Sequence, residues 1–407
     1  MSADGRRVVI VGASLAGTRT AQGLRQLGYT GPVTLVGAES ELPYDRPPLS
    51  KDLLKADWSE EAIESVRLAT AEELRDADVE LILGNAASHL DVAAKTVDLT
   101  DGTKIAYDVL VVATGAVARP SPWRPASGVY QLRTLDDSRA IAARLAHGGH
   151  VVVVGGGFIG TEIAAAARGH GCEVTIVDPL EEPMTRLVGP EVAGSLVDLH
   201  GRNGARTRFG VGVVGIEGRD DDLVVTLADG DTIPAATVVV GIGSIPSTGW
   251  LEDSGLVLDN GVVCDGLLRA EGVPDVYAVG DVARWPHPGR GVLVRAEHWT
   301  NASDQARYVA TALATGTEEP YQPSDYVWSD QYDWKVNAVG WRDPEGSSIV
   351  VGDLDEDGRV AVVHADAHGV ACGAVTVNWV RALNQLRRLL ATGGTVADIV
   401  DQLRQRA

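Results

Sequence analysis

The amino-acid sequence predicts an α/β protein in which two similar dinucleotide-binding units share one chain, the second inserted in the first, and a smaller α+β domain follows. Three observations support this prediction: a glycine-rich loop within residues 151–164, a second loop of the same kind within residues 7–17, and a similar hairpin after each loop. Strands that alternate with helices in this way form parallel sheets, because each helix returns the chain to the same edge.

The clearer glycine loop lies in VVVVGGGFIGTEIA, at residues 151–164. Four valines form a strand, and Gly155, Gly157 and Gly160 follow in G-x-G-x-x-G spacing before a helix-like run. The first glycine allows a tight turn, the second lets the backbone approach a pyrophosphate, and the third lets the helix pack close to the strand. The helix N-terminus then faces the negative charge. A single loop of this kind can also be a turn that binds nothing.

The second glycine loop lies near the N-terminus. Residues 7–11 (RVVIV) read as a buried strand, and Gly12, Ser14 and Gly17 lead into a helix over residues 18–27. Serine replaces the middle glycine, and its small side chain still leaves room for a phosphate. The chain therefore carries two candidate pyrophosphate sites.

A carboxylate about 20 residues beyond each loop is expected to accept hydrogen bonds from a ribose. In the first unit the candidate is Glu39, although Ala38 occupies the more usual position and Glu39 could be a solvated loop carboxylate. In the second unit Asp178 ends a strand and favours the free 2′-hydroxyl of NADH over the phosphate of NADPH. Arg186 lies close by in sequence, where it either weakens that preference or is an exposed charge.

A hairpin follows each loop in the same arrangement. Residues 97–115 and 225–243 each contain an Asp-Gly turn, a buried apolar run and a closing glycine, Gly115 or Gly243. Each Asp lies 14 positions before the closing glycine. An Asp-Gly turn between alternating segments predicts a hairpin. The repeat makes it improbable that both glycine loops are coincidences.

Two further segments are candidates for the nucleotide sites. Residues 44–51 include two prolines with Arg46 and Lys51, so a stiff loop carries cations, although an ordinary proline turn has the same composition. Residues 275–281 read as a buried strand that ends in Asp281, a position that suits sugar-like hydroxyls.

Two helical segments are predicted outside the glycine loops. A helix from Glu297 to about Ala314 could direct its free N–H groups at an electron-rich ring, with His298 in a structural or packing role. An acidic helix is expected over residues 57–78, without a chemical role.

The composition changes after about residue 321, where a third domain is expected. Trp328 and Trp334 are expected on one strand, where they fill a core or mark an interface. Strands at residues 350–351 and 360–363 and an amphipathic helix over 377–390 complete the α+β pattern.

Composition and charge exclude several classes of protein. The chain has 407 residues, of which 45% are hydrophobic, and a formal net charge of −21. Such acidity disfavours nucleic-acid surfaces and anionic membranes. The three cysteines form no CxxC motif, so neither a zinc site nor a disulfide framework is indicated. With no apolar run long enough to span a bilayer and no signal peptide, a cytoplasmic location is expected.

The motifs together resemble a known family, the FAD-dependent, NAD(P)H-using ferredoxin reductases that serve bacterial oxygenases and cytochromes P450. This group includes the putidaredoxin, rubredoxin and biphenyl-dioxygenase ferredoxin reductases and is related to apoptosis-inducing factor. The matching segments, in the family's order, are VVIVGASLAG, LPYDRPPLSK, LVVATGA, QLRTLDD, VVVVGGGFIGTEIA, VVVGIGSIP, VYAVGDVA, EHWTNA and VWSDQYD. They cover nearly the whole chain, and the part after about Gly373 matches least.

The resemblance implies a glutathione-reductase-like fold with two Rossmann-like domains. It implies an FAD-binding domain of residues 1–115 and 244–321, an NADH-binding domain of residues 116–243 inserted in it, and a C-terminal α+β domain of residues 322–407.

The resemblance also implies the site residues. Those for FAD are Gly12, Ser14, Leu15, Ala16, Gly17, Glu39, Arg46, Pro47, Lys51, Ala87, Ala113, Thr114, Gly115, Arg133, Gly280, Asp281, Glu297, His298 and Trp299. Those for NADH are Gly155, Gly157, Phe158, Ile159, Gly160, Glu162, Asp178, Arg186 and Gly243. Ser14 and Ala38 depart from the family's pattern, so the ribose contact of Glu39 is the weakest of these assignments.

The implied mechanism is electron transfer in which NADH, the co-substrate, gives a hydride to tightly bound, non-covalent FAD. Electrons then pass one at a time to a [2Fe–2S] ferredoxin that feeds a cytochrome P450 or Rieske-type oxygenase. Lys51 and Glu162 are expected to form an ion pair beside the reacting rings, and Trp328 to lie near the electron exit or in the core. The ferredoxin is expected on a locally basic patch formed by Arg284, Arg290, Arg295 and Lys335.

Two alternatives remain open at this point. An NADH oxidase, peroxidase or disulfide reductase of the same fold would need a reactive cysteine, and residues 45–51 contain none. A redox-signalling flavoprotein that resembles apoptosis-inducing factor would be reduced by NADH without supporting turnover.

Overall fold

The structure, a computed structural model, describes residues 5–404, apart from the side chains of Arg186 and Leu187. It divides into two compact units, which are described separately. Unit 1 comprises Met1–Asp45, Ile63–Val117 and Ser244–Ser324, and unit 2 comprises Arg46–Ala62, Ala118–Gly243 and Asp325–Ala407.

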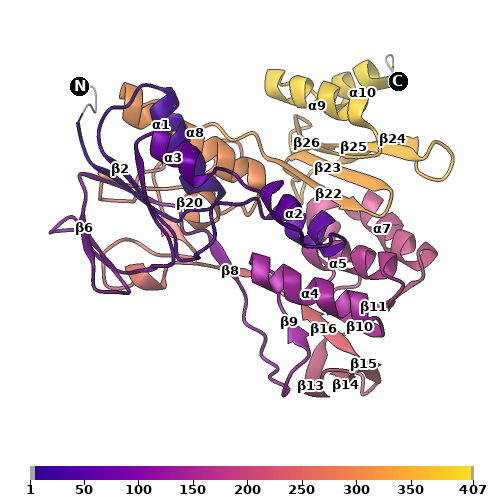
Figure 1. Cartoon of the computed structure of the whole chain (residues 1–407). Coiled ribbons are helices and arrows are strands. Elements are labelled where there is room, and N and C mark those ends of the chain that lie inside the picture. The colour runs from indigo at the N-terminus through magenta and orange to yellow at the C-terminus, as the bar shows by residue number, and fades with distance from the viewer. Residues whose placement is uncertain (1–4, 405–407) are drawn as a thin grey trace. The chain divides into compact units, whose positions relative to one another are not determined.

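Unit 1 contains a five-stranded parallel sheet (Figure 1). Its strands, in spatial order, are β19 (Val276–Ala278), β7 (Val109–Val112), β1 (Val8–Val11), β2 (Val33–Val36) and β3 (Val79–Ile82). Their β-branched and leucine side chains are mostly buried, as expected of a parallel sheet covered on both faces. The helices α1 (Leu15–Gln26) and α8 (Trp299–Thr315) pack against each other beside it.

The predicted first hairpin is confirmed in β5 (Thr96–Leu99) and β6 (Lys104–Ala106), which join β4 (Ala87–Asp91) in an antiparallel sheet. Gly102 has a φ of +89° in the turn, a conformation that glycine adopts without strain. The remaining strands of this part of the chain are β8 (Ala116–Ala118), β17 (Ser244–Pro246), β18 (Val262–Val263), β20 (Ala283–Pro286) and β21 (Leu293–Val294).

The acidic segment of residues 57–78, whose pattern is helical, is helical only in part. The segment contains two short helices, α2 (Glu60–Glu64) and α3 (Ala71–Asp76). Thr70 accepts a hydrogen bond from the backbone N–H of Glu73 while the Glu73 carboxylate accepts one from the N–H of Thr70. This capping box starts a new helix and so interrupts the pattern.

Unit 2 contains a second five-stranded parallel sheet. Its spatial order is β12 (Ala205–Phe209), β11 (Glu173–Asp178), β10 (His150–Val154), β16 (Thr237–Val240) and β9 (Val129–Tyr130). The helices near it are α4 (Leu135–His147), α5 (Phe158–Gly169), α6 (Thr185–Val188) and α7 (Pro190–Arg202). The second predicted hairpin is confirmed in β14 (Asp222–Leu227) and β15 (Thr232–Ala235), which pair beside β13 (Val213–Arg219).

Unit 2 also contains an antiparallel sheet formed by the C-terminal part of the chain. Its order is β22 (Tyr326–Gln331), β23 (Trp334–Gly340), β26 (Ala371–Val377), β25 (Arg359–Ala365) and β24 (Ser348–Asp353). One face packs on α9 (Val380–Thr392) and α10 (Val396–Arg404), and the other packs on α7. The predicted helix begins later than expected, at Val380, because residue 377 still belongs to β26.

The placement of Trp328 and Trp334 on one strand is also wrong. Trp328 lies on β22 and Trp334 on β23, because the chain reverses at Tyr332, which has a φ of +54°. Trp334 is buried in the apolar cluster between this sheet and α7. Trp334 therefore fills a core.

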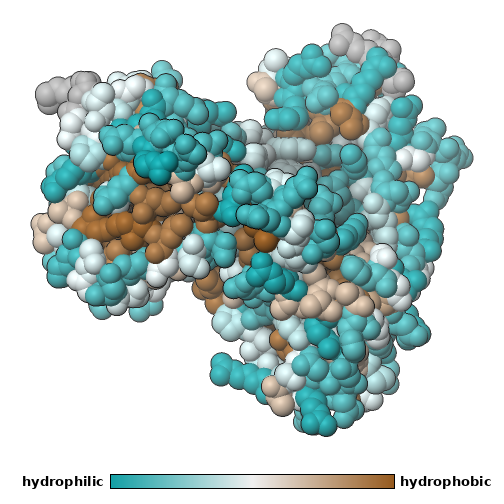
Figure 2. Space-filling model, in the orientation of Figure 1, coloured by the Kyte–Doolittle hydropathy of each residue, from teal (hydrophilic) through white to brown (hydrophobic). Residues whose placement is uncertain are grey.

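The face of the protein seen in Figure 2 is mostly hydrophilic, and its most extensive group of hydrophobic residues lies over the elements of unit 1. An apolar patch in an otherwise polar surface is typical of a binding site. Within residues 5–404 no helix combines the length and apolar character that crossing a membrane requires.

Candidate functional site

The glycine loop of unit 1 requires its glycines for steric reasons. Gly12 has a φ of +119°, and a Cβ there would collide with the carbonyl oxygen of Ala113. A Cβ at Gly17 would collide with the carbonyl oxygen of Gly12. The turn and the close approach of helix to strand are therefore real, as in dinucleotide-binding folds. Ser14 is the N-cap of α1, but its side chain does not cap the helix.

Three of the segments predicted to bind FAD meet at one edge of the unit 1 sheet. Gly12 follows β1, residues 113–115 follow β7, and Gly280 and Asp281 follow β19. Because these strands are parallel and adjacent, their carboxyl ends lie together, which is where ligands bind in open α/β sheets.

A buried polar atom at this edge fits a bound ligand. The Gln305 side chain is fully buried, and its Oε1 accepts a 2.7 Å hydrogen bond from the N–H of Gly280. Among the described residues its Nε2 has no hydrogen-bond partner. A buried donor without an acceptor is costly, and a phosphate or hydroxyl oxygen would supply one. The site therefore fits a dinucleotide such as FAD.

Glu39 and Ala87 lie in the same unit. Glu39 accepts a 2.5 Å hydrogen bond from the Tyr44 hydroxyl, so it is held by its own loop as well as being half-buried. Ala38 is exposed, and Ala87 begins β4.

The start of α8 is fixed on several sides. His298 is its N-cap, and the Trp299 indole N–H donates a 2.6 Å hydrogen bond to Asp45. Burial raises the pKa of Asp45, while this hydrogen bond acts in the opposite direction. Glu297 pairs with Arg295 at 2.7 Å and also accepts a hydrogen bond from Ser244. These contacts hold the first turn of α8 in one orientation.

The glycine loop of unit 2 has the same geometry. A Cβ at Gly155 would collide with the carbonyl oxygen of Gly241, and one at Gly160 with that of Gly155. At Gly157, the N-cap of α5, a Cβ would meet nothing within 4 Å. The open space lies at the positive end of α5, where the pyrophosphate of a dinucleotide fits. Phe158 and Ile159 form the first turn of this helix.

Asp178 is placed at the same edge as the loop, at the end of β11. Its Oδ2 accepts a 2.8 Å hydrogen bond from the N–H of Gly156, and its Oδ1 accepts one from the N–H of Leu180. The carboxylate therefore shapes the glycine loop, a contact that the sequence did not reveal. Gly243 follows β16 at the same edge with a φ of +99°. Arg186 belongs to α6, but its side chain lies outside what the structure describes.

Exchanging Asp178 for alanine should lower the preference for NADH over NADPH by about tenfold, because the contact to the 2′-hydroxyl and the repulsion of a 2′-phosphate are lost together. The measurement is the ratio of kcat/KM for the two co-substrates. Asp178→Asn keeps an acceptor for Gly156 and separates loop shape from charge. An unchanged ratio in both variants would remove the role of Asp178 in this choice.

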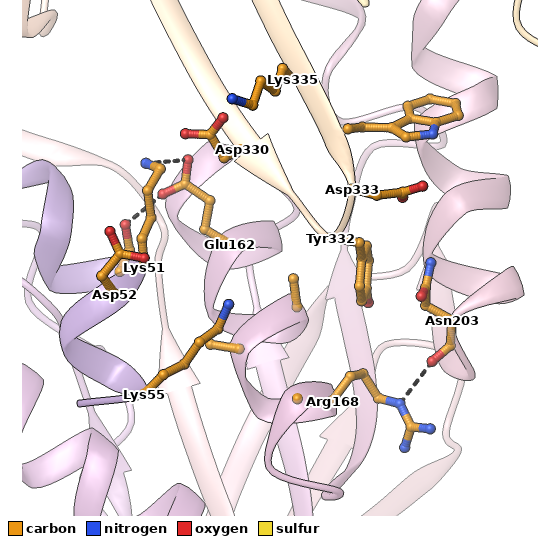
Figure 3. A pocket seen from close by; sticks show the side chains of 15 residues that line it. Lys51, Asp52, Lys55, Glu162, Arg168, Asn203, Asp330, Tyr332, Asp333 and Lys335 are labelled. Atoms are coloured by element: carbon orange, nitrogen blue, oxygen red, sulfur yellow. Dashed lines mark hydrogen bonds and ion pairs between the residues drawn. The ribbon is translucent and has the colours of Figure 1, made fainter. Parts of the chain in front are cut away.

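Lys51 and Glu162 form a buried ion pair within unit 2 (Figure 3). Lys51 follows η1 (Pro47–Ser50), Glu162 lies on α5, and the Lys51 Nζ is 2.8 Å from Glu162 Oε1. The side chain of Glu162 is 4% exposed. Two serine hydroxyls also donate to this carboxylate, Ser50 to Oε2 and Ser329 to Oε1, the latter at 2.5 Å. A buried charge is stable only when it is paired and hydrogen-bonded, and both conditions hold here.

The Lys51–Glu162 pair lines a pocket of about 550 Å³ in unit 2 (Figure 3). Lys55, Arg168 and Lys335 also line it, together with three aspartates: Asp52, Asp330 and Asp333. This lining is polar and of mixed charge. The pair is thus placed at an accessible wall rather than in a closed core.

Other predicted residues of unit 2 make contacts of their own. The Arg46 guanidinium donates to the backbone carbonyl of Arg133, so these two residues are in contact. Pro47 begins η1. Trp328 is partly buried and stacks on Tyr326, with ring centroids 5.9 Å apart. Trp328 points away from Glu162, because the neighbouring Ser329 occupies the opposite face of β22.

Two of the four residues expected in the basic patch are already paired. Arg284 pairs with Asp259, and Arg295 pairs with Glu297 and is 10% exposed. Their charges are compensated within unit 1, so these two arginines offer no free charge to an acidic partner.

Sequence reasoning missed Ser50, Ser329 and Gln305. Ser50 directly precedes Lys51 and had no distinguishing pattern. Ser329 and Gln331 alternate along β22 and are both fully buried. Two polar residues at a period of two on a buried strand face are the signal that could have identified Ser329.

The family comparisons agree with this geometry. Residues 6–306 match the family described as pyridine nucleotide-disulphide oxidoreductase, and residues 326–404 match the reductase C-terminal family. The chain is 38% identical to rhodocoxin reductase of Rhodococcus erythropolis, over 95% of this chain and 89% of that protein. It is also 38% identical to the ferredoxin–NAD(+) reductase component of the p-cumate 2,3-dioxygenase system of Pseudomonas putida, over 95% and 94%.

A solved structure gives the same result. The covalent putidaredoxin reductase–putidaredoxin complex matches with a TM-score of 0.89 and 33% identity, over 95% of this chain and 93% of that chain. The expected FAD and NADH are the cofactor and co-substrate of this family. The predicted fold of two parallel-sheet nucleotide-binding units and a C-terminal α+β domain is therefore confirmed. The chain belongs to the pyridine nucleotide-disulphide oxidoreductase family and, within it, to the ferredoxin reductases.

Proposed function

We propose that this protein is an NADH-dependent ferredoxin reductase that uses FAD and passes electrons to a [2Fe–2S] ferredoxin. The proposal rests on the two glycine loops, one in each unit, which have the same geometry and are called the glycine cradles below. Only the loop of unit 2 leads into a helix, α5, whose Glu162 forms an ion pair with Lys51. A transient hydride donor must be held in a fixed orientation each time it binds, and an ion pair on the helix of its loop would help to provide that.

FAD, when bound, supplies the chemistry of accepting a hydride and releasing electrons singly. In unit 1 the loop at Gly12 and Gly17 would bind its pyrophosphate, and Asp281 and the start of α8 would orient the rest. In unit 2 the loop at Gly155 and Gly157 would bind NADH. Glu162 would hold the ammonium group of Lys51 in a fixed place beside the nicotinamide. No residue of the chain needs to act as an acid or base on a substrate.

The domain boundaries expected from the sequence are retained in this proposal. The FAD-binding domain is residues 1–115 and 244–321, the NADH-binding domain is residues 116–243, and the C-terminal domain is residues 322–407. They are supported by the sheets, because the strands of each five-stranded sheet come from one of these ranges.

The partner is proposed from the names of the relatives. The p-cumate relative is a component of a dioxygenase system, and the matching solved structure holds a reductase with putidaredoxin. A [2Fe–2S] ferredoxin that feeds a Rieske-type oxygenase or a cytochrome P450 is therefore the proposed acceptor. A cytoplasmic location is part of the same proposal.

The cysteines give no support to a disulfide reductase. Burial raises the pKa of the Cys264 thiol to about 12 and also raises that of Cys172, so neither is a ready thiolate. Burial likewise raises the pKa of Cys372 to about 11. A dithiol or disulfide centre therefore has no candidate among the three cysteines.

The test is NADH-dependent reduction of cytochrome c by the purified protein, with and without added [2Fe–2S] ferredoxins. We expect a yellow protein and at least a roughly tenfold increase in rate with a suitable ferredoxin. A colourless protein that cannot be loaded with FAD would contradict the whole proposal. Flavin reduction by NADH without turnover on any one-electron acceptor would instead favour a redox-signalling flavoprotein.

A further inference from the structure

A continuous chain of side-chain hydrogen bonds links the C-terminal domain to Glu162. The chain begins at Tyr332, whose hydroxyl lies 3.2 Å from His200 Nδ1. His200 Nε2 lies 3.2 Å from Gln331 Oε1, and Gln331 Nε2 donates to Ser329 Oγ at 3.3 Å. Ser329 then donates to Glu162 Oε1 at 2.5 Å. All of these residues belong to unit 2.

The donors and acceptors of this chain fit in only one direction. The amide oxygen of Gln331 only accepts, so His200 must carry its proton on Nε2. His200 Nδ1 is then an acceptor, to which the Tyr332 hydroxyl donates a hydrogen bond. The amide N–H of Gln331 donates to the Ser329 hydroxyl, and this hydroxyl in turn donates to Glu162. Every donor therefore points toward the carboxylate, and each bond polarises the next in the same sense.

Burial keeps the members of this chain neutral. Ser329 and Gln331 are fully buried and His200 is 1% exposed. Burial lowers the pKa of His200 to about 4 and raises that of Tyr332 to about 12. At neutral pH the imidazole is therefore uncharged and the phenol keeps its proton, as the direction of the chain requires.

The carboxylate is held from two sides that are far apart in sequence. Ser50, next to Lys51, donates to Oε2, and Ser329, from the C-terminal sheet, donates to Oε1. Oε1 also contacts Lys51 at 2.8 Å. A free glutamate side chain has three rotatable bonds, and contacts at both oxygens select one arrangement.

We propose that Ser329, Gln331 and His200 are positioning residues for the Lys51–Glu162 pair, so that the C-terminal domain is a working part of the NADH site. This inference rests on the proposed function, because it assigns the pair a place beside the nicotinamide. The first step of the reaction then depends on residues of β22 and α7 that touch neither NADH nor FAD. Preorganisation of this kind is what holds a functional group in its productive geometry.

The first test compares anaerobic reduction of the bound flavin by NADH in rapid-mixing experiments. Ser329→Ala should lower the limiting rate about tenfold, equivalent to about 1.4 kcal/mol, while the NADH concentration for half-saturation changes less than about twofold. Gln331→Leu should lower the limiting rate about threefold, because Ser329 remains but loses its orientation. Ser348→Ala is the matched control: its hydroxyl lies 2.9 Å from Nδ1 of His364, a buried histidine on the neighbouring strand of the C-terminal sheet, and among the described residues no hydrogen bond joins it to Glu162.

The second test examines the hydrogen-bond chain in the absence of turnover. It uses nitrogen-15 NMR of the His200 ring in protein free of NADH. If the hydrogen-bond chain is intact, His200 should be the Nε2–H tautomer. Gln331→Leu should produce a mixture of the two His200 tautomers, whereas Ser348→Ala should not. An Nδ1–H tautomer in the unmodified protein would contradict the proposed direction of these hydrogen bonds. Equal limiting rates in Ser329→Ala and Ser348→Ala would show that the chain has no effect on the pair. If NADH fails to reduce the unmodified protein, the proposed function is wrong, whereas the NMR result still decides whether the chain exists.

Discussion

Exchanging Glu162 for alanine should slow reduction of the bound flavin by NADH about 100-fold, with little change in FAD content. The substitution removes the partner of a largely buried Lys51, 2.8 Å away, and leaves two serine hydroxyls without their acceptor. The lysine side chain then has no fixed position beside the nicotinamide. FAD content should be retained because the glycine cradle of unit 1 does not involve this residue. Anaerobic rapid mixing measures the rate, and the absorbance of released flavin measures the content.

Glu162→Gln is the informative companion variant. It keeps an acceptor for both serines but removes the charge, so the limiting rate should lie between those of the unmodified protein and Glu162→Ala. If the FAD content of Glu162→Ala falls by the same factor as its rate of flavin reduction, the carboxylate supports the fold and not the reaction. If the rate of Glu162→Ala is unchanged, the ion pair has no part in hydride transfer.

The parts of the fold that the sequence predicts well are those set by local patterns. Gly12 and Gly155 have φ values of +119° and +113°, conformations in which side chains are strained, so the glycines mark these turns directly. The two Asp-Gly hairpins follow for the same reason. Buried parallel strands are also readable, because both of their faces are apolar.

The predicted secondary structure differs from the structure where a capping box or a turn interrupts a continuous pattern in the sequence. Residues 57–78 have helical composition, but the Thr70 capping box divides the segment. Trp328 and Trp334 are close in sequence, but a turn at Tyr332 separates them onto two strands. A turn that lacks glycine and proline gives little warning in the sequence.

The candidate site was predicted incompletely because its decisive contacts are long-range. The sequence and its resemblance indicated Lys51 and Glu162, but the hydroxyls that hold the carboxylate come from Ser50, 112 residues away from Glu162, and Ser329, 167 residues away. Contacts of this kind depend on how sheets and helices pack, which no spacing rule encodes.

Exchanging Gly157 for aspartate should raise the NADH concentration for half-saturation about 100-fold or more while the fold and the FAD content remain unchanged. Gly157 has ordinary backbone angles, with φ −76° and ψ 178°, and a Cβ there meets nothing within 4 Å. Aspartate is also a favourable N-cap, so α5 should form normally. Its carboxylate would occupy the helix N-terminus and repel the pyrophosphate that must bind there. Flavin reduction at increasing NADH concentration measures the effect.

The equivalent position in unit 1 supplies the matched control, because Ser14 is the N-cap of α1 as Gly157 is of α5. Ser14→Asp should lower FAD content and not NADH affinity, so the two variants distinguish the two cradles. Dithionite should still reduce the flavin of Gly157→Asp, since that reductant needs no nucleotide site. Gly157→Ser should stay within about fivefold of the unmodified protein, because the first cradle already carries a serine at this place. Unchanged NADH binding in Gly157→Asp would show that the pyrophosphate does not lie at α5, and the roles given to the two cradles would have to be reconsidered.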